Sequence, residues 1–108
     1  MKRGEVWWVE FDPAVGTEIT KTRPAVIISN DAANRNLNRV VVIPCTSNVT
    51  SKYPGEAFIT IDNNKSKSMS DQIMTADKKR LKTKICTLSK SDMQAIEIEL
   101  RIHLGMHK

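Results

Sequence analysis

The 108-residue sequence contains only two cysteines, two histidines and five aromatic residues. Cys45 and Cys86 form no CxxC pair and have no histidine at metal-ligand spacing, so we interpret them as two reduced, partly buried thiols. Both histidines, His103 and His107, lie in the last six residues, and P-loop, HExxH and EF-hand motifs are absent. These absences argue against metal-centred, P-loop and histidine-pair catalysis, and we expect no metal and no cofactor.

Long apolar segments are also missing. The longest apolar runs, such as residues 40–43, are far shorter than the ~20 residues that a membrane-spanning helix needs. No apolar segment follows the basic start of the chain, because Glu5 and Glu10 flank the tryptophans, so a secretory signal is not expected. The length allows one domain, residues 1–108, and we expect a cytoplasmic protein without membrane contact.

Positive charge is in excess. Seventeen lysines and arginines against twelve acidic residues give a net charge of +5 and a pI near 9.4. This balance favours a polyanionic partner, either nucleic acid or an acidic protein segment.

Short stretches rich in β-branched and aromatic residues predict a mainly β fold. Alternating or wholly apolar patterns indicate strands at residues 4–11, 24–29, 39–45, 56–61, 68–75 and 81–88. In the first of these, Trp7, Val9 and Phe11 share one face, whereas Val6 and Trp8 share the other. The third strand is expected to stop near Pro44. We predict a small antiparallel barrel with short helices.

The C-terminal segment alternates as a strand would, but its composition favours a helix. Ser91 and Gln94 form an S-x-x-Q capping box ahead of residues with high helix propensity. A helix here has two apolar stripes, which are Met93, Ile96, Leu100 and Leu104 on one side and Ala95, Ile98 and Ile102 on the other. We expect one stripe to pack on the sheet, and the other either to contact a second copy or to be covered by the same domain.

Three stretches could bind an anion. Pro24 forces an extended backbone at Arg23, whose guanidinium offers a permanently charged fork for a phosphate; a surface ion pair with Glu18 is the alternative. Thr46 and Ser47 follow a buried strand, where hydroxyls also commonly satisfy turn backbone. Residues 78–84 hold five cations that could follow a nucleic-acid backbone or form a solvated face.

Taken in order, these stretches resemble the MazF/PemK (Kid) family of toxin endoribonucleases. The resemblance covers nearly the whole chain and rests on Arg3-Gly4-Glu5-Val6-Trp7, Phe11-Asp12-Pro13, Gly16, Glu18, Lys21, Arg23-Pro24, Val26-Ile27-Ile28-Ser29, Pro44-Cys45-Thr46-Ser47, Asp71-Gln72-Ile73, Thr75, Asp77 and Arg80-Leu81. It implies an SH3-like barrel that forms homodimers. It also implies sequence-specific cleavage of single-stranded RNA without a metal or ribosome, and inhibition by a cognate antitoxin.

The resemblance also implies roles for particular residues. The family's catalytic arginine and threonine fall on Arg23 and Thr46, and the loop at 13–22, with Glu18, corresponds to a segment that closes over RNA. Arginine is a poor acid or base. Glu18 is a candidate proton acceptor if burial in a closed loop raises its pKa, but a nearby Arg23 would lower that pKa, so the sequence leaves the acceptor open. We expect RNA contacts from Lys21, Thr22, Ser47, Tyr53, Gln72, Lys78, Lys79 and Arg80. A base could stack on Trp7, Trp8, Tyr53 or Phe58, and we choose Tyr53 because its loop at 47–55 is expected to expose it.

Two other functions share this fold class. A gyrase-poisoning toxin would need a tryptophan-containing C-terminus, which the final residues Leu104 to Lys108 lack. A non-catalytic RNA-binding barrel would fit the charge but gives no reason for the pairing of Arg23 with Thr46.

Overall fold

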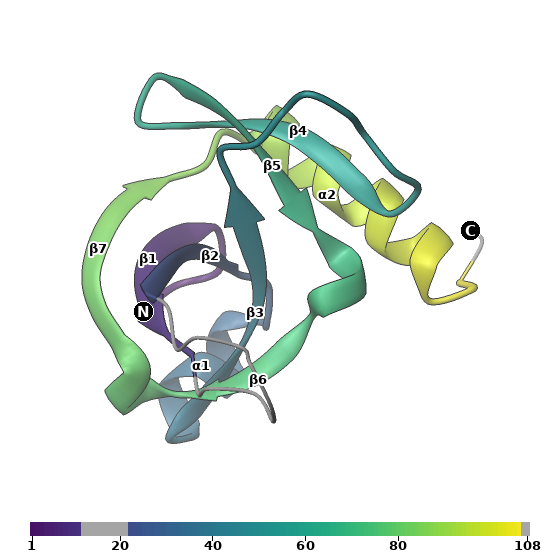
Figure 1. Cartoon of the computed structure of the whole chain (residues 1–108). Helices are drawn as coiled ribbons and strands as arrows, with labels where there is room; N and C mark the ends of the chain where they lie inside the picture. Colours follow the sequence, from purple (N-terminus) through teal and green to yellow (C-terminus); the bar gives the residue numbers. More distant parts are fainter. Residues whose placement is uncertain (12–21, 107–108) are drawn as a thin grey trace, which may run out of the picture.

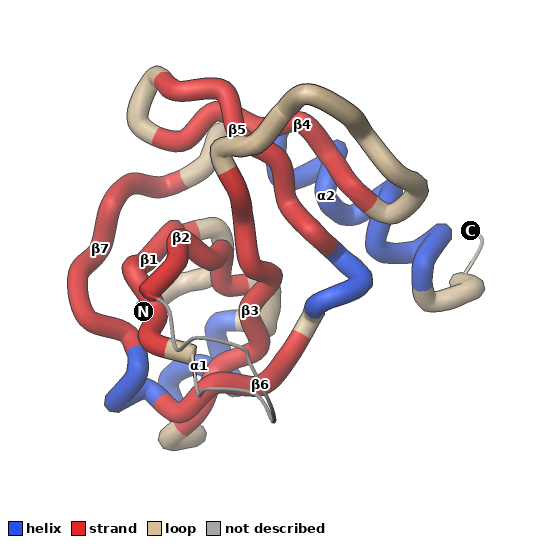
Figure 2. Tube along the Cα trace, viewed as in Figure 1, coloured by secondary structure: helices blue, strands red, loops and turns tan. Residues whose placement is uncertain are grey.

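The computed structural model describes residues 1–11 and 22–106, which fold into one curled antiparallel sheet with two α-helices. The sheet order is β4-β5-β3-β2-β1-β7, with β6 paired to β3. Figure 1 shows the strands curving around the centre of the molecule, and Figure 2 shows the helical segments at its margins. The strands are β1 (Glu5–Glu10), β2 (Thr22–Ile27), β3 (Arg39–Thr46), β4 (Glu56–Ile61), β5 (Asn64–Met69), β6 (Met74–Asp77) and β7 (Leu81–Thr87). The predicted mainly β architecture with a C-terminal helix is confirmed, in the form of an open half-barrel.

Two prolines lie inside strands rather than at their ends. The prediction that the second strand begins at Pro24 was wrong, because β2 begins at Thr22 and pairs with β3 only from Ala25 onward. The strand β3 likewise continues through Pro44 to Thr46. Pro44 lies between the pairing with β6, which ends at Val42, and the pairing with β5, which begins at Cys45. Each proline therefore lies where its strand has no paired neighbour on one side, so the missing N–H interrupts no hydrogen bonds between strands there.

The hairpin β4–β5 replaces the predicted fifth strand at residues 68–75. Ile61 pairs with Asn64 across a two-residue turn in which Asp62 and Asn63 both have positive φ, the conformation of a type I′ hairpin. The chain then forms the 3-10 turn η1 (Ser70–Gln72) before β6. The alternation criterion missed β5 because its sequence, NKSKSM, is almost entirely polar.

The core consists of two apolar clusters on opposite faces of the central strands. Val6 belongs to a cluster with β4 and the C-terminal helix, whereas Val9 belongs to a second cluster with Val40 and Leu81. Trp7 packs against the second cluster, as the alternation predicts. Trp8 keeps 41% of its surface exposed, so β1 is covered on both faces except at Trp8 and at its last residue, Glu10.

The helix α2 (Lys90–His103) packs against β4 (Figure 1). Its N-cap is Ser89, whose side chain accepts a hydrogen bond from the Asp92 backbone N–H, so the predicted capping box at Ser91 and Gln94 was wrong. Met93 and Ile96 are buried against the sheet. No helix among the described residues is long and apolar enough to cross a membrane.

The two stripes of α2 have different environments. Leu100 packs with the first cluster, but Leu104, predicted on the same stripe, lies beyond the end of the helix and is exposed. On the other stripe, Ile98 and Ile102 are 55% and 47% exposed. Ala95 of this stripe packs against the first cluster, so Ile98 and Ile102 are its uncovered residues within the described chain.

The helix α1 (Asp31–Asn36) is a short connection between β2 and β3. Asn30 caps it by accepting a hydrogen bond from the Ala33 backbone N–H at 2.8 Å. Its short length agrees with the prediction of a helical turn in this asparagine-rich stretch.

Candidate active site

A cavity of about 710 Å³ opens between the end of β3, the strand pair β1–β2 and the hairpin β4–β5. It is lined by Trp8, Arg23, Pro24, Cys45, Thr46, Ser47, Ile61, Asp62, Asn64, Lys65, Ser66 and Ile85. The volume lies within the ~300–1,000 Å³ typical of small-molecule sites. Arg23 and Thr46, which are far apart in the sequence, both line this cavity.

Arg23 is placed by the pairing of β2 with β1, in which it lies opposite Val9. Its side chain is half-buried. Within residues 1–11 and 22–106 its guanidinium has no hydrogen-bond or ion-pair partner. The alternative ion pair with Glu18 lies outside the described residues, as does Lys21. A half-buried, uncommitted guanidinium is well suited to a bidentate contact with a phosphate.

Thr46 is the last residue of β3, and it points a hydroxyl group at the rim of the cavity. Its Oγ1 accepts a hydrogen bond from the Asn48 backbone N–H at 3.2 Å. The hydroxyl oxygen therefore satisfies a backbone N–H of the turn after β3, as hydroxyl groups of strand-end threonines commonly do. Its proton stays available for donation, because a hydroxyl group both donates and accepts. Ser47 adds a second, exposed hydroxyl to the same rim.

Sequence reasoning missed the residues that the hairpin β4–β5 brings to the cavity. Asp62 is the first residue of the two-residue turn, Asn64 directly follows the turn, and Asn64 Nδ2 donates to the Asp62 carbonyl oxygen at 3.2 Å. Among the aromatic candidates for stacking, the sequence favours Tyr53 over Trp8, whereas Trp8 is the one that lines the cavity. The signal that could have found the hairpin is the Asp62-Asn63 pair itself, since Asn and Asp tolerate the positive φ of a type I′ turn.

The basic segment at residues 78–80, the 3-10 turn η2 between β6 and β7, does not line the cavity. Lys78 Nζ donates to the Asn34 carbonyl oxygen, and an Arg80 guanidinium N–H donates to the Glu10 carbonyl oxygen at 3.3 Å. Lys79 is exposed. Two of these three cations are thus bonded to backbone carbonyl groups.

The remaining predicted RNA contacts lie outside the cavity as well. Tyr53 is 63% exposed in the loop after β3, and Gln72 is exposed in η1, where its amide contacts Met69 Sδ at 3.6 Å. Thr22 is exposed at the start of β2, next to Arg23. The structure therefore brings Arg23, Thr46 and Ser47 together and leaves the other described candidates around them.

A buried ion pair fixes the loop at residues 47–55, which carries Ser47 and Tyr53. Lys67 Nζ lies 2.9 Å from Glu56 Oε1 and donates to the Ser51 carbonyl oxygen at 2.6 Å. Glu56 also accepts from the Tyr53 backbone N–H at 2.8 Å. Burial acts to raise the pKa of Glu56, but the hydrogen bonds from Tyr53 and Lys67 outweigh it and lower the pKa. The pair holds the loop from two sides.

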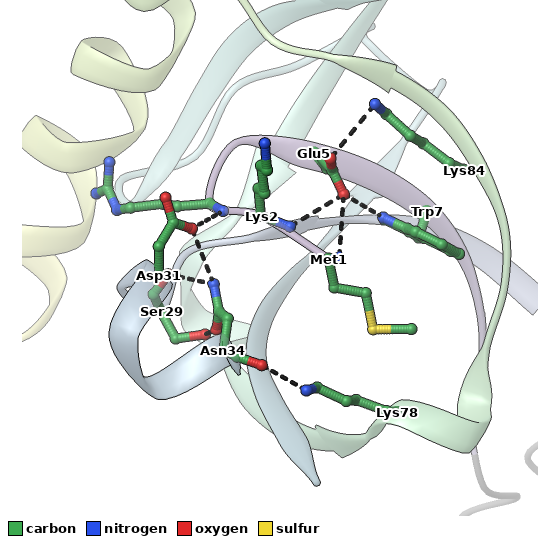
Figure 3. A network of polar contacts seen from close by, with 10 residues as sticks. Met1, Lys2, Glu5, Trp7, Ser29, Asp31, Asn34, Lys78 and Lys84 are labelled. Atoms are coloured by element: carbon green, nitrogen blue, oxygen red, sulfur yellow. Dashed lines mark hydrogen bonds and ion pairs between the residues drawn. The ribbon is translucent and has the colours of Figure 1, made fainter. Parts of the chain in front are cut away.

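A second polar network anchors the N-terminus and Trp7 on the face opposite Trp8 (Figure 3). The Glu5 carboxylate accepts from Lys2 N and Trp7 Nε1, each at 3.0 Å, and lies 3.3 Å from Lys84 Nζ. Burial acts to raise the pKa of Glu5, but these contacts lower it overall. Trp7 is thus held by its indole N–H, whereas the Trp8 indole has no hydrogen-bond partner among the described residues.

The described residues provide a buried thiol at the cavity but no metal-binding cluster. Cys45 contributes to the lining from a buried position, and burial raises the pKa of its thiol to about 12. Among the described residues, no three histidine, cysteine or acidic side chains lie close enough together to hold a metal ion.

The whole chain has close relatives in sequence and structure. The family model for PemK-like, MazF-like toxins of type II toxin–antitoxin systems matches residues 2–104. Endoribonuclease MazF9 of Mycobacterium tuberculosis is 33% identical over 115 residues, covering 98% of both chains. Endoribonuclease MazF of Staphylococcus saprophyticus is 35% identical over 114 residues, covering 99% of this chain and 93% of the relative.

Solved structures show the same fold. MazF of Deinococcus radiodurans superposes with a TM-score of 0.83 at 23% identity, covering 98% of this chain and 97% of that one. A mycobacterial endoribonuclease in complex with its cognate antitoxin gives a TM-score of 0.82 at 23% identity, covering 100% and 98%.

The fold and the cavity define a small β half-barrel whose cavity is lined by the Arg23 guanidinium and by the hydroxyl-bearing residues Thr46 and Ser47. By sequence, the chain belongs to the family of PemK-like, MazF-like toxins of type II toxin–antitoxin systems.

Proposed function

We propose that the chain is a sequence-specific endoribonuclease that cleaves single-stranded RNA without a metal ion or a ribosome, as the toxin of a type II toxin–antitoxin pair. The observation that carries the proposal is that Arg23 and Thr46 line one cavity, in a chain whose curated relatives are named endoribonucleases.

The chemistry uses the RNA's own 2′-hydroxyl as the nucleophile. Its oxygen forms a bond to the adjacent phosphorus while the bond from phosphorus to the 5′-oxygen breaks, which leaves a 2′,3′-cyclic phosphate and a 5′-hydroxyl end. One proton leaves the 2′-hydroxyl and one reaches the departing 5′-oxygen. Negative charge grows on the non-bridging oxygens, so the enzyme must supply charge stabilisation there.

Arg23 and Thr46 fit the need for charge stabilisation at the non-bridging phosphate oxygens. The guanidinium supplies a charged fork for two phosphoryl oxygens, and the Thr46 hydroxyl donates to the phosphate or orients the 2′-hydroxyl. Glu18 is the proposed proton acceptor. Ser47 and Thr22 flank these two residues in the chain and are proposed phosphate contacts, with Lys21, Gln72 and the basic segment at 78–80 following the RNA beyond the cavity.

The proposed partners are an antitoxin and a second copy of the chain. A disordered acidic segment would complement the +5 charge and displace RNA from the rim. The exposed stripe of Ile98 and Ile102 on α2 is the proposed homodimer contact, since apolar side chains at this spacing favour a partner helix or sheet. Ile102→Glu is expected to yield a monomer in light scattering, whereas an unchanged dimer would move the contact elsewhere.

One experiment separates this function from a gyrase poison or a binding module. Purified protein is incubated with a long single-stranded RNA in EDTA, and the ends of the fragments are mapped. Discrete cuts with 5′-hydroxyl ends support the proposal. Intact RNA with retained binding indicates a binding module, and intact RNA with arrested DNA supercoiling indicates a gyrase poison.

A further inference from the structure

The cavity is larger and more varied than a phosphate site requires. Arg23 and Thr46 account for one part of its lining, but Trp8 and the turn of the β4–β5 hairpin account for another. These residues carry an aromatic face, an amide and a carboxylate, which are the groups that proteins use to bind a nucleobase.

Trp8 has the properties of a stacking surface. It stands opposite Pro24 in the β1–β2 pairing, one position from Arg23, and 41% of its surface is exposed. Its neighbour Trp7 is fixed by a hydrogen bond to Glu5, but the Trp8 indole has no such bond among the described residues. Packing and hydrogen bonding therefore explain Trp7 and do not explain why a large aromatic side chain is kept in the open at Trp8.

The hairpin turn offers polar groups to the same cavity. Asp62 and Asn64 line the same cavity, and one N–H of the Asn64 amide is already committed to the Asp62 carbonyl oxygen. The amide oxygen and the Asp62 carboxylate have no partner among the described residues. A carboxylate only accepts hydrogen bonds, so it favours a base edge that carries an amino group over one bounded by carbonyl groups.

We propose that this part of the cavity is a nucleobase subsite, in which the base next to the scissile phosphate stacks on Trp8 and turns an amino-bearing edge toward Asp62 and Asn64. The subsite takes adenine, cytosine or guanine in preference to uracil. The inference rests on the proposed function, because it assumes that Arg23 and Thr46 hold the phosphate. It also assigns stacking to Trp8 rather than to Tyr53, which lies outside the cavity.

Binding to a non-cleavable RNA tests the subsite separately from catalysis. Fluorescence anisotropy with labelled 2′-O-methyl oligonucleotides measures the affinity of the wild type, Trp8→Ala, Trp8→Phe and Tyr53→Ala. Base–aromatic stacking predicts a loss of roughly 5- to 100-fold for Trp8→Ala, with most of the affinity kept by Trp8→Phe. Tyr53→Ala is the comparison variant, because Tyr53 is the exposed aromatic residue that the sequence favours for stacking, and the proposal expects its loss of affinity to be smaller than that of Trp8→Ala. Equal effects of Trp8→Ala and Tyr53→Ala would overturn the proposal.

The hairpin part is tested by sequencing the cut sites of Asp62→Asn and Asn64→Ala on a long RNA. Asp62→Asn is expected to relax the discrimination against uracil at the position next to the cut while cleavage continues. An unchanged cut-site preference in both variants would remove the hairpin from the subsite. If the wild type cuts no RNA at all, the proposed function fails, whereas the anisotropy series still decides whether Trp8 stacks a base. Thermal unfolding of each variant confirms that the fold is intact.

Discussion

The cavity and the basic segment at residues 78–80 both carry cationic side chains, but they hold them differently. Arg23 is half-buried, lines the same cavity as Thr46 and has no partner among the described residues. In the basic segment, Lys78 and Arg80 donate to backbone carbonyl groups instead. The proposed function assigns catalysis to the uncommitted guanidinium and only RNA binding to the basic segment. The following predictions test this contrast, beginning with the largest expected effect.

Arg23→Ala is expected to reduce RNA cleavage by roughly 100- to 1,000-fold, because it removes the charge that stabilises the transition state. The free energy of unfolding should stay within ~0.5 kcal/mol of the wild type, as expected for a side chain without partners in residues 1–11 and 22–106. Cleavage rates and urea unfolding measure the two quantities. A large loss of stability with unchanged cleavage would assign Arg23 to structure.

Thr46→Ala is expected to reduce cleavage by roughly 10- to 100-fold, since it removes one donor from the phosphate region. It also removes the acceptor for the Asn48 N–H, at a cost of about 1 kcal/mol. Thr46→Ser keeps the hydroxyl and should retain most of the activity in single-turnover assays. If Ser and Ala are equally impaired, the methyl group rather than the hydroxyl matters.

Lys67→Met is expected to lower the free energy of unfolding by about 2 kcal/mol, because Glu56 is left without its charged partner under the loop. The value is below that of a fully enclosed pair, since solvent reaches the loop. The double variant with Glu56→Gln should recover part of the loss in chemical unfolding. Additive losses in the double variant would show that the two side chains act independently.

Lys79→Gln is expected to change little more than the salt dependence of RNA binding. One phosphate contact to a single strand contributes a slope of ~0.7 in log affinity against log salt, so the slope should decrease by about that much. The maximal cleavage rate should be unchanged, in contrast to Arg23→Ala. A fall in that rate would place the basic segment next to the reacting phosphate.

Acid should loosen the loop at 47–55. The pKa of Glu56 is lowered from 4.5 despite burial, through its bonds to Tyr53 and Lys67. A depressed carboxyl pKa stabilises the fold above the unfolded value, and this contribution is lost as the pH falls through the folded value. The free energy of unfolding, measured from neutral pH to below 4.5, should therefore vary less with pH for Glu56→Gln than for the wild type. Parallel curves would show that Glu56 does not titrate in this range.

The sequence was sufficient for the elements that alternate or carry a turn signal. The strand at residues 56–61 follows from its alternation, and the C-terminal helix follows from its composition. The faces of β1 follow from the alternation around Trp7 and Trp8. The strand β5 could not be found this way, because its inward-facing positions include serines rather than apolar residues.

The cavity was predicted only in part. The resemblance to known toxins named Arg23 and Thr46, and their shared lining of one cavity agrees with that expectation. Trp8 and Asp62 could not be assigned, because their position depends on how β3 changes partners and lets the hairpin fold over the strand pair β1–β2. Such long-range packing leaves no local pattern in the residues themselves.

The left-handed backbone at Asp62 and Asn63 restricts the amino acids that this corner can accept. Glycine, asparagine and aspartate enter that conformation most readily, so substitutions that keep the hairpin exchange one short polar group for another. In the proposed nucleobase subsite, the base preference can therefore change by exchange of glycine, asparagine and aspartate at positions 62 and 63, while the strands of the hairpin stay the same.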